Sequence, residues 1–111
     1  MASFIGGEVV LTGTTPVTVV TAPGASEQKQ VLSLWAINRD STTRTITAKK
    51  LKTAGSVSIT IGKVTLDTLL RGQLIQASVV LDDTDETITV ESDATAATTE
   101  PIVDVAIFKV P

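Results

Sequence analysis

The sequence predicts an all-β protein, a single-domain antiparallel β-sandwich of about eight strands with a jelly-roll-like or immunoglobulin-like topology. Thr, Val and Ile number 19, 14 and 9 among 111 residues, and β-branched side chains favour a pleated sheet over a helix. Turn residues interrupt the apolar runs at short, regular intervals, which is typical of sandwiches and barrels. A chain of this length has room for one hydrophobic core, so we expect one domain.

The first half of the chain divides into five expected strands, which are residues 8–12, 17–21, 31–38, 43–52 and 56–61. Each run ends at residues that favour turns, such as Pro23 and Gly24 after the second strand. The fifth run alternates apolar and polar residues with a period of two. We therefore expect Val57, Ile59 and Ile61 to face the core.

The second half contains three further expected strands, which are residues 74–81, 87–91 and 102–110. Residues 64–70 fit either one helical turn or a bending strand, and the polar segment 92–100 is expected to be a loop. We expect Ile88 and Val90 to point inward, as do Val103, Val105 and Ile107 in the last strand.

Two units follow from these elements. Residues 1–13 form an N-terminal arm with the first strand, and residues 14–111 form the sandwich domain. Phe4 and Ile5 precede two glycines in the arm. The arm either adds a strand to the sheet of a neighbouring subunit or is a disordered terminus.

The composition excludes several kinds of chemistry. The chain has no His and no Cys, so it lacks an imidazole base, a thiol nucleophile, a disulfide and a Cys/His zinc site. We expect no enzyme, no cofactor and no metal. The net charge of −3 argues against nucleic-acid binding, and no apolar run is long enough to span a bilayer. The start of the chain lacks the features of a signal peptide, which predicts a protein made in the cytoplasm.

Several expected strands are apolar on both faces. In residues 31–38, Trp35 lies on one face and Leu34 on the other, and Trp35 is expected to be buried against the opposite sheet. Either loops cover the second face, or it packs against another copy of the chain. Phe108 has the opposite parity to Ile107 and is a candidate for such a contact, as are Phe4, Ile5 and Trp35.

Lys49, Lys50 and Lys52 form the only basic cluster. They either protect an edge strand from unwanted pairing or dock onto an acidic protein surface. No aromatic residue alternates with them, so phosphate or base recognition is disfavoured.

Residues 82–86 form the most acidic segment, with the sequence DDTDE. Adjacent carboxylates in a turn are usually solvated. A calcium site is the alternative, although the spacing does not match an EF-hand loop, so no metal ligand is predicted.

The order of motifs resembles that of small β-sandwich structural proteins from the virions of tailed bacteriophages. The motifs are VLSLWAIN at residues 31–38, TRTITA at 43–48, DDTDETITV at 82–90 and VDVAIFKV at 103–110. The resemblance covers residues 16–110. Two features depart from the family pattern: an acidic segment replaces Gly-Asp at 82–86, and Lys109 stands where glycine usually follows Phe.

The resemblance implies a capsid decoration, or cement, protein on the outer surface of the virion. Such proteins commonly form homotrimers that bridge subunits of the major capsid protein, so we expect both the chain itself and that protein as partners. A neck or tail component is the alternative within the same class. A carbohydrate-binding or calcium-binding adhesion module is the alternative from another class.

Overall fold

The computed structural model describes residues 3–53 and 56–110, with side chains from residue 5 onward. These residues form nine strands and no helix. The strands are β1 (Ser3–Val10), β2 (Val17–Val20), β3 (Gln28–Ile37), β4 (Arg44–Lys52), β5 (Val57–Leu66), β6 (Arg71–Gln73), β7 (Val79–Leu81), β8 (Glu86–Ser92) and β9 (Ile102–Val110). None of the described residues forms a helix that could cross a membrane.

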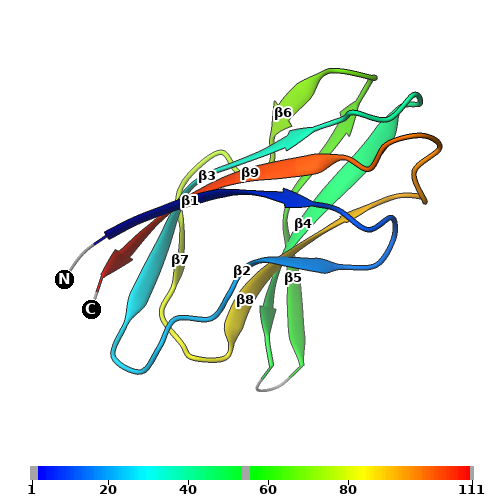
Figure 1. The fold of residues 1–111 in the computed structure, drawn as a ribbon. Coiled ribbons are helices and arrows are strands. Elements are labelled where there is room, and N and C mark those ends of the chain that lie inside the picture. Colours follow the sequence, from blue (N-terminus) through cyan, green and yellow to red (C-terminus); the bar gives the residue numbers. More distant parts are fainter. Residues whose placement is uncertain (1–2, 54–55, 111) are drawn as a thin grey trace.

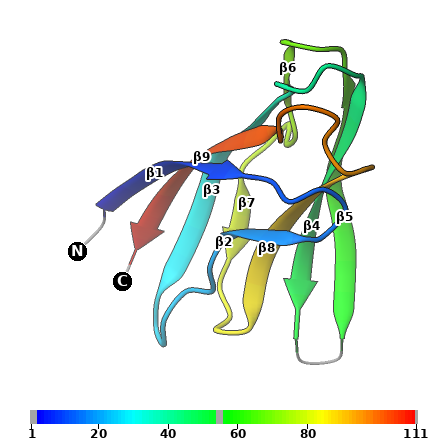
Figure 2. The ribbon, with the colours of Figure 1, turned by 45° about the vertical axis from the view of Figure 1, so that its right-hand side comes forward.

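The strands form two antiparallel sheets that pack face to face (Figures 1 and 2). The five-stranded sheet has the order β1-β9-β3-β6, with β7 also paired to β3, and the four-stranded sheet has the order β2-β8-β4-β5. The pairs are nested, because β1 pairs with β9, β2 with β8, β3 with β6 and β7, and β4 with β5. This is the strand order of a jelly roll, so the β-sandwich is confirmed and its topology is not immunoglobulin-like.

The hydrophobic core lies between the sheets. Its fully buried side chains come from both layers, for example Leu34 and Val103 from the five-stranded sheet and Ile46, Ile88 and Val90 from the other. The inward positions expected in residues 87–91 and 102–110 are confirmed. Each large aliphatic side chain buried in this way contributes about 1.5–3 kcal/mol.

The segment between β6 and β7 leaves the five-stranded sheet, to which both strands belong, and crosses part of the core between the sheets. The backbone N–H of Leu74 donates to the carbonyl of Leu34 at 2.7 Å, and Leu74 and Ile75 enter the core. A Cβ atom on Gly62 of β5 would lie 1.5 Å from the carbonyl oxygen of Leu74. Glycine at position 62 therefore permits the closest approach between the sheets. This crossing also explains why the strand expected over 74–81 is reduced to β7.

The N-terminal segment belongs to the sandwich. From Ser3 to Val10, β1 pairs with β9 along its whole length, with Phe4 opposite Phe108 in the register. The first strand therefore begins earlier than the expected residue 8. In the described residues, this segment is an edge strand of its own sheet. It is neither a strand added to a neighbouring subunit nor a disordered terminus.

The expectation that Val57 and Ile59 lie in the core is wrong, and of the two alternatives for residues 64–70 the strand is confirmed as far as Leu66. Val57 and Ile59 are 43% and 55% exposed, because the start of β5 lies at the tip of the β4–β5 hairpin, beyond the cover of the other sheet. Residues 67–70 form no helical turn. Leu66 ends β5 in the core, whereas Leu69 and Leu70 are exposed in the connecting loop.

The sandwich has two ends with different connections. The loop end gathers residues 11–16, 38–43, 67–70 and 93–101. The hairpin end, at the opposite ends of the same strands, contains residues 21–27, 82–85 and the tip of the β4–β5 hairpin (Figure 1).

Candidate functional site

The outer face of the five-stranded sheet carries an unusual number of apolar side chains. Gln30, Phe108 and Val80 share this face, because Val80 and Phe108 lie opposite Gln30 in the two registers. Leu32 and Val80 are 40% and 38% exposed, and Trp35 and Phe108 are half-buried. No described segment forms a third layer over this face. We call it the outer apolar face and define it by Leu32, Trp35, Val80, Ala106 and Phe108.

Trp35 lies on this face because of a β-bulge in β3. The pairing of β3 with β9 shifts register between Val31 and Ser33, so Val31 and Leu34 both point into the core. The extra residue reverses the alternation that follows, which places Trp35 outside. Its expected burial against the opposite sheet is therefore wrong. The Arg71 guanidinium lies 4.9 Å from the centroid of the indole ring, a cation–π contact that covers part of the ring.

The other apolar interface candidates are distributed over both faces of the sheet. Phe108 lies on the outer apolar face, and the backbone of Phe4 lies opposite it. The side chain of Phe4 is outside the described residues. Ile5 is opposite Ile107, a core residue, so it faces inward, but it is 43% exposed at the edge of the sheet. Ile5 and Phe108 therefore do not form one patch.

The three candidate lysines lie on β4, which is not an edge strand. β4 sits between β8 and β5, so the role of protecting an edge is excluded by the topology. Each lysine has a carboxylate partner: Lys49 Nζ is 3.0 Å from Glu91, Lys50 Nζ is 3.0 Å from Glu86, and Lys52 pairs with Asp83. These carboxylates lie on β8 and in the turn before it. The three lysines therefore have little unpaired positive charge for docking onto an acidic partner.

The acidic turn is organised by Glu86. Its Oε1 atom accepts hydrogen bonds from the amides of Asp82 and Asp83 at 2.9 and 3.0 Å. Burial raises the pKa of Glu86, but those amides and Lys50 outweigh it and lower the pKa to about 2. Carboxylate oxygens of Asp82, Asp83 and Glu86 lie within 4.8 Å of one another. The amides and the lysines already account for this clustering, so the geometry gives no independent reason for a cation.

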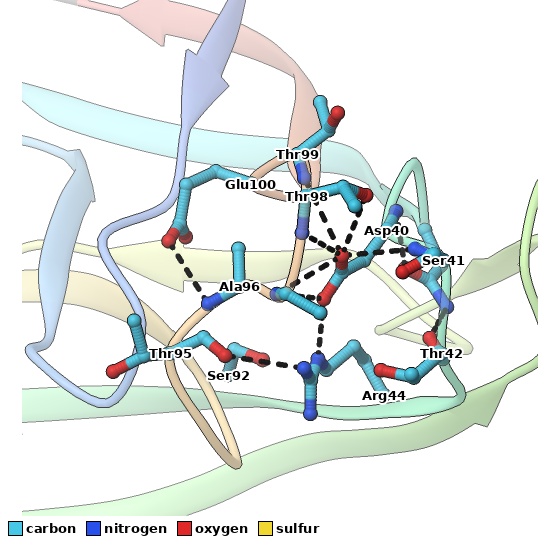
Figure 3. A network of polar contacts seen from close by, with 12 residues as sticks. Asp40, Ser41, Thr42, Arg44, Ser92, Thr95, Ala96, Thr98, Thr99 and Glu100 are labelled. Atoms are coloured by element: carbon cyan, nitrogen blue, oxygen red, sulfur yellow. Dashed lines mark hydrogen bonds and ion pairs between the residues drawn. The ribbon is translucent and has the colours of Figure 1, made fainter.

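A second buried charge was missed by the sequence analysis. Asp40 is fully buried in the loop after β3, and its carboxylate accepts hydrogen bonds from the amides of Ala97 and Thr98, both at 2.9 Å (Figure 3). Arg44 Nε lies 2.8 Å from Asp40 Oδ2. The amide of Ala97 is the largest cause that holds the pKa of Asp40 well below its usual range, with Thr98 and Arg44 acting in the same direction against burial. These donors occupy both oxygens, so Asp40 joins two loops and offers little to a ligand.

The hollow at the tip of the β4–β5 hairpin is small and open. Its volume is about 240 Å³, and it is lined by Leu51, Lys52, Thr53, Ser56, Val57 and Ser58. Ligand pockets are usually larger, about 300–1,000 Å³, and enclose convergent polar groups. Among the described residues, the outer apolar face therefore remains a candidate surface for contact with a partner.

Comparison with known proteins supports the fold alone. No family model and no curated protein matches the sequence. A chain from Bacillus endospore appendages, which form a family of disulfide-linked pili, is similar in structure with a TM-score of 0.55 and 11% identity, over 98% of this chain and 85% of that one. The Drosophila NLP-core, studied for pentamer formation and histone binding, has a TM-score of 0.53 and 16% identity, over 98% and 99% of the two chains.

Proposed function

We propose that this chain is a non-enzymatic structural protein of a phage virion, most specifically a capsid decoration protein. It coats the outer capsid surface as an oligomer and bridges subunits of the major capsid protein. The proposal combines the motif order, the jelly-roll topology and the outer apolar face. Jelly rolls recur in viral capsid domains and in lectins, so topology alone does not choose between these roles.

The outer apolar face is the observation that carries the proposal. A soluble protein rarely leaves large side chains such as Leu32, Val80 and Trp35 together on a surface without a partner for them. The face is the outer surface of a sheet, which suits contact with another protein surface rather than with a small ligand. Many modest contacts of this kind, repeated over a shell, multiply in effective strength.

The two similar structures agree with a role in assembly. One comes from a pilus and the other from a protein that forms pentamers. This chain contains no cysteine, so it does not share the disulfide linkage of those pili. Assembly would rest on surface complementarity between folded domains.

The carbohydrate-binding alternative is less well supported. A sugar platform needs an open aromatic ring, and Arg71 already lies over the only tryptophan. A calcium-binding module has no support beyond the acidic turn, whose carboxylates pair with lysines and amides.

The test is binding of purified protein to phage capsids that lack it. We expect the wild-type chain to cover the whole shell in an electron cryomicroscopy map. Leu32→Lys and Val80→Lys, which place a charge on the outer apolar face, should reduce occupancy strongly. Thr18→Lys is the matched control, because Thr18 is exposed on the outer face of the other sheet.

Three outcomes would contradict the proposal. Density confined to a single ring at one vertex would assign the chain to the neck or tail. An absence of binding to any shell would remove the virion role. Equal occupancy for Leu32→Lys, Val80→Lys and Thr18→Lys would remove the outer apolar face from the contact.

A further inference from the structure

The free edge of β5 differs from the other sheet edges of the described residues. β5 is ten residues long, whereas β2, at the opposite edge of the same sheet, has four and β6 and β7 have three each. β1 is eight residues long and carries Glu8, and β5 itself carries Lys63, beyond Gly62. An edge strand presents unpaired backbone N–H and C=O groups, which another extended strand can satisfy.

The first part of this edge also lacks the usual protection against pairing. Residues 56–62 contain no charged side chain and no proline. Lys52 and Lys50 lie opposite Val57 and Ile59, and this side of the sheet is the one that faces the core further along. At this end the other sheet does not reach, so Val57 and Ile59 are exposed as an apolar row beside an open backbone edge.

The two lysines opposite this row are paired with carboxylates of the same chain. Lys50 pairs with Glu86, and Lys52 pairs with Asp83 and lies 3.7 Å from Asp85. Two copies can therefore approach through this edge without bringing unpaired lysines together. The edge is then selective for a strand with the same properties: uncharged, and apolar on one face.

We propose that β5 pairs antiparallel with β5 of a second copy, around a twofold axis at Ile59. Val57 then lies opposite the partner's Ile61, and Ile59 lies opposite the partner's Ile59. This register keeps the apolar side of both strands on one face and joins the two four-stranded sheets into one continuous sheet. The irregularity in the β4–β5 pairing lies at Ile61, between Thr60 and Gly62, which is the last position of this register. The contact goes beyond the proposed function, since it concerns how copies join each other and not which particle they bind.

The first test compares the masses of two variants by sedimentation over a range of concentrations. Ile59→Lys places a charge on the pairing edge, where we expect the mass to fall to half that of the wild-type assembly. Leu69→Lys is the matched control: Leu69 is 79% exposed in a loop, so the same substitution should leave the mass unchanged. Equal masses for wild type and Ile59→Lys would overturn the pairing, as would an equal loss in Leu69→Lys.

The second test reads the register directly and does not depend on how well Ile59→Lys folds. Because the chain has no cysteine, Ile59→Cys introduces a single thiol. Residues directly opposite in an antiparallel pair are close enough for a disulfide, so mild oxidation should yield a covalent dimer. Leu69→Cys should remain uncrosslinked under the same conditions. A crosslink that is equally efficient at both positions, or absent at position 59, would overturn the twofold register. Either result leaves the capsid-binding experiment to be judged separately.

Discussion

The loop end and the hairpin end of the sandwich are held together by different chemistry. At the loop end, Asp40 is fully buried and accepts hydrogen bonds from backbone amides of the loop before β9. Glu100 in turn accepts from the amide of Gly13 at 2.9 Å, which attaches the loop between β1 and β2. Backbone amides have fixed positions, so the loops at this end are joined by hydrogen bonds from backbone amides to carboxylates.

At the hairpin end the contacts join flexible side chains. Lys50 and Lys52 reach carboxylates of the turn between β7 and β8, and Lys109 lies 3.0 Å from Glu27. Lys29 donates to the carbonyl and hydroxyl of Thr21, and burial lowers its pKa. Exposed ion pairs contribute little to stability. The loop end is therefore held mainly through backbone amides, whereas at the hairpin end the buried Glu86 is held in this way and most other contacts are ion pairs of lysines.

The largest effect is expected at Gly62, between the two ends. Gly62→Ala would force its Cβ into the carbonyl oxygen of Leu74, a backbone atom that cannot move without separating the sheets. We expect a loss of more than ~4 kcal/mol in the free energy of unfolding, measured by denaturant titration. Gly7→Ala is the control, because a Cβ there meets nothing within 4 Å. If both variants lost the same stability, the close approach would not be the cause.

The next largest effect tests the loop end. Asp40→Asn removes the charge and replaces one acceptor oxygen with a donor that faces backbone amides. We expect the melting temperature to fall by ~10 °C or more. Asp93→Asn should change it by no more than ~2 °C, since Asp93 is 46% exposed and lies 3.9 Å from Arg44. A smaller effect for Asp40→Asn than for Asp93→Asn would contradict the contrast between the two ends.

Acid should weaken the two ends at different pH values. The pKa of Glu86 is lowered from 4.5 to about 2, so its contribution is complete above pH 4.5 and is lost as the pH falls towards 2. The pKa of Asp40 starts at 3.8 and is lowered by more than the pKa of Glu86. The stability that the ionised Asp40 contributes therefore persists to lower pH. Denaturant titrations at pH 5, 3 and 2 should therefore show a shallower loss for Glu86→Gln than for wild type. An identical slope would mean that Glu86 does not govern the acid response of the hairpin end.

The smallest effect is expected for the most exposed ion pair. The hydrogen bond to Asp83 raises the pKa of Lys52, so the pair forms at neutral pH, but both side chains are substantially exposed to solvent. Lys52→Gln should lower the melting temperature by no more than ~2 °C. The difference from wild type should shrink further in high salt. A large, salt-independent loss would show that the hairpin end is fastened as firmly as the loop end.

The fold class and the strand positions could be predicted because they depend on local patterns. The alternation at Ile88 and Val90 matches the buried positions of β8, and the same holds for Val103 and Val105 in β9. These strands lie inside their sheets, where one face packs against the core. Periodicity and burial then coincide.

The outward position of Trp35 could not be predicted, because one additional residue in β3 reverses the faces of all that follow. The bulge at Leu32 leaves no mark in the sequence that distinguishes it from regular alternation. Ile59 shows the opposite case: its alternation is regular, but the other sheet ends before reaching it.

The roles of charged residues were also hard to predict, because their partners lie far away in the sequence. The three lysines of β4 form an obvious cluster, but their partners lie on β8 and the turn before it, which sequence distance conceals. Asp40 carries no local signal, since its amide donors lie 57 and 58 residues away. Only the topology brings these groups together.

The pairing of the first strand with the last has a consequence for how the protein folds. β9 lies between β1 and β3, so this sheet cannot assemble on the ribosome until residues 102–110 have been made. Contacts between such distant parts of a chain close slowly, and the delay leaves apolar strands exposed in the meantime. The edges of β1 and β3 that face β9 should consequently stay open to other partners until β9 has been made.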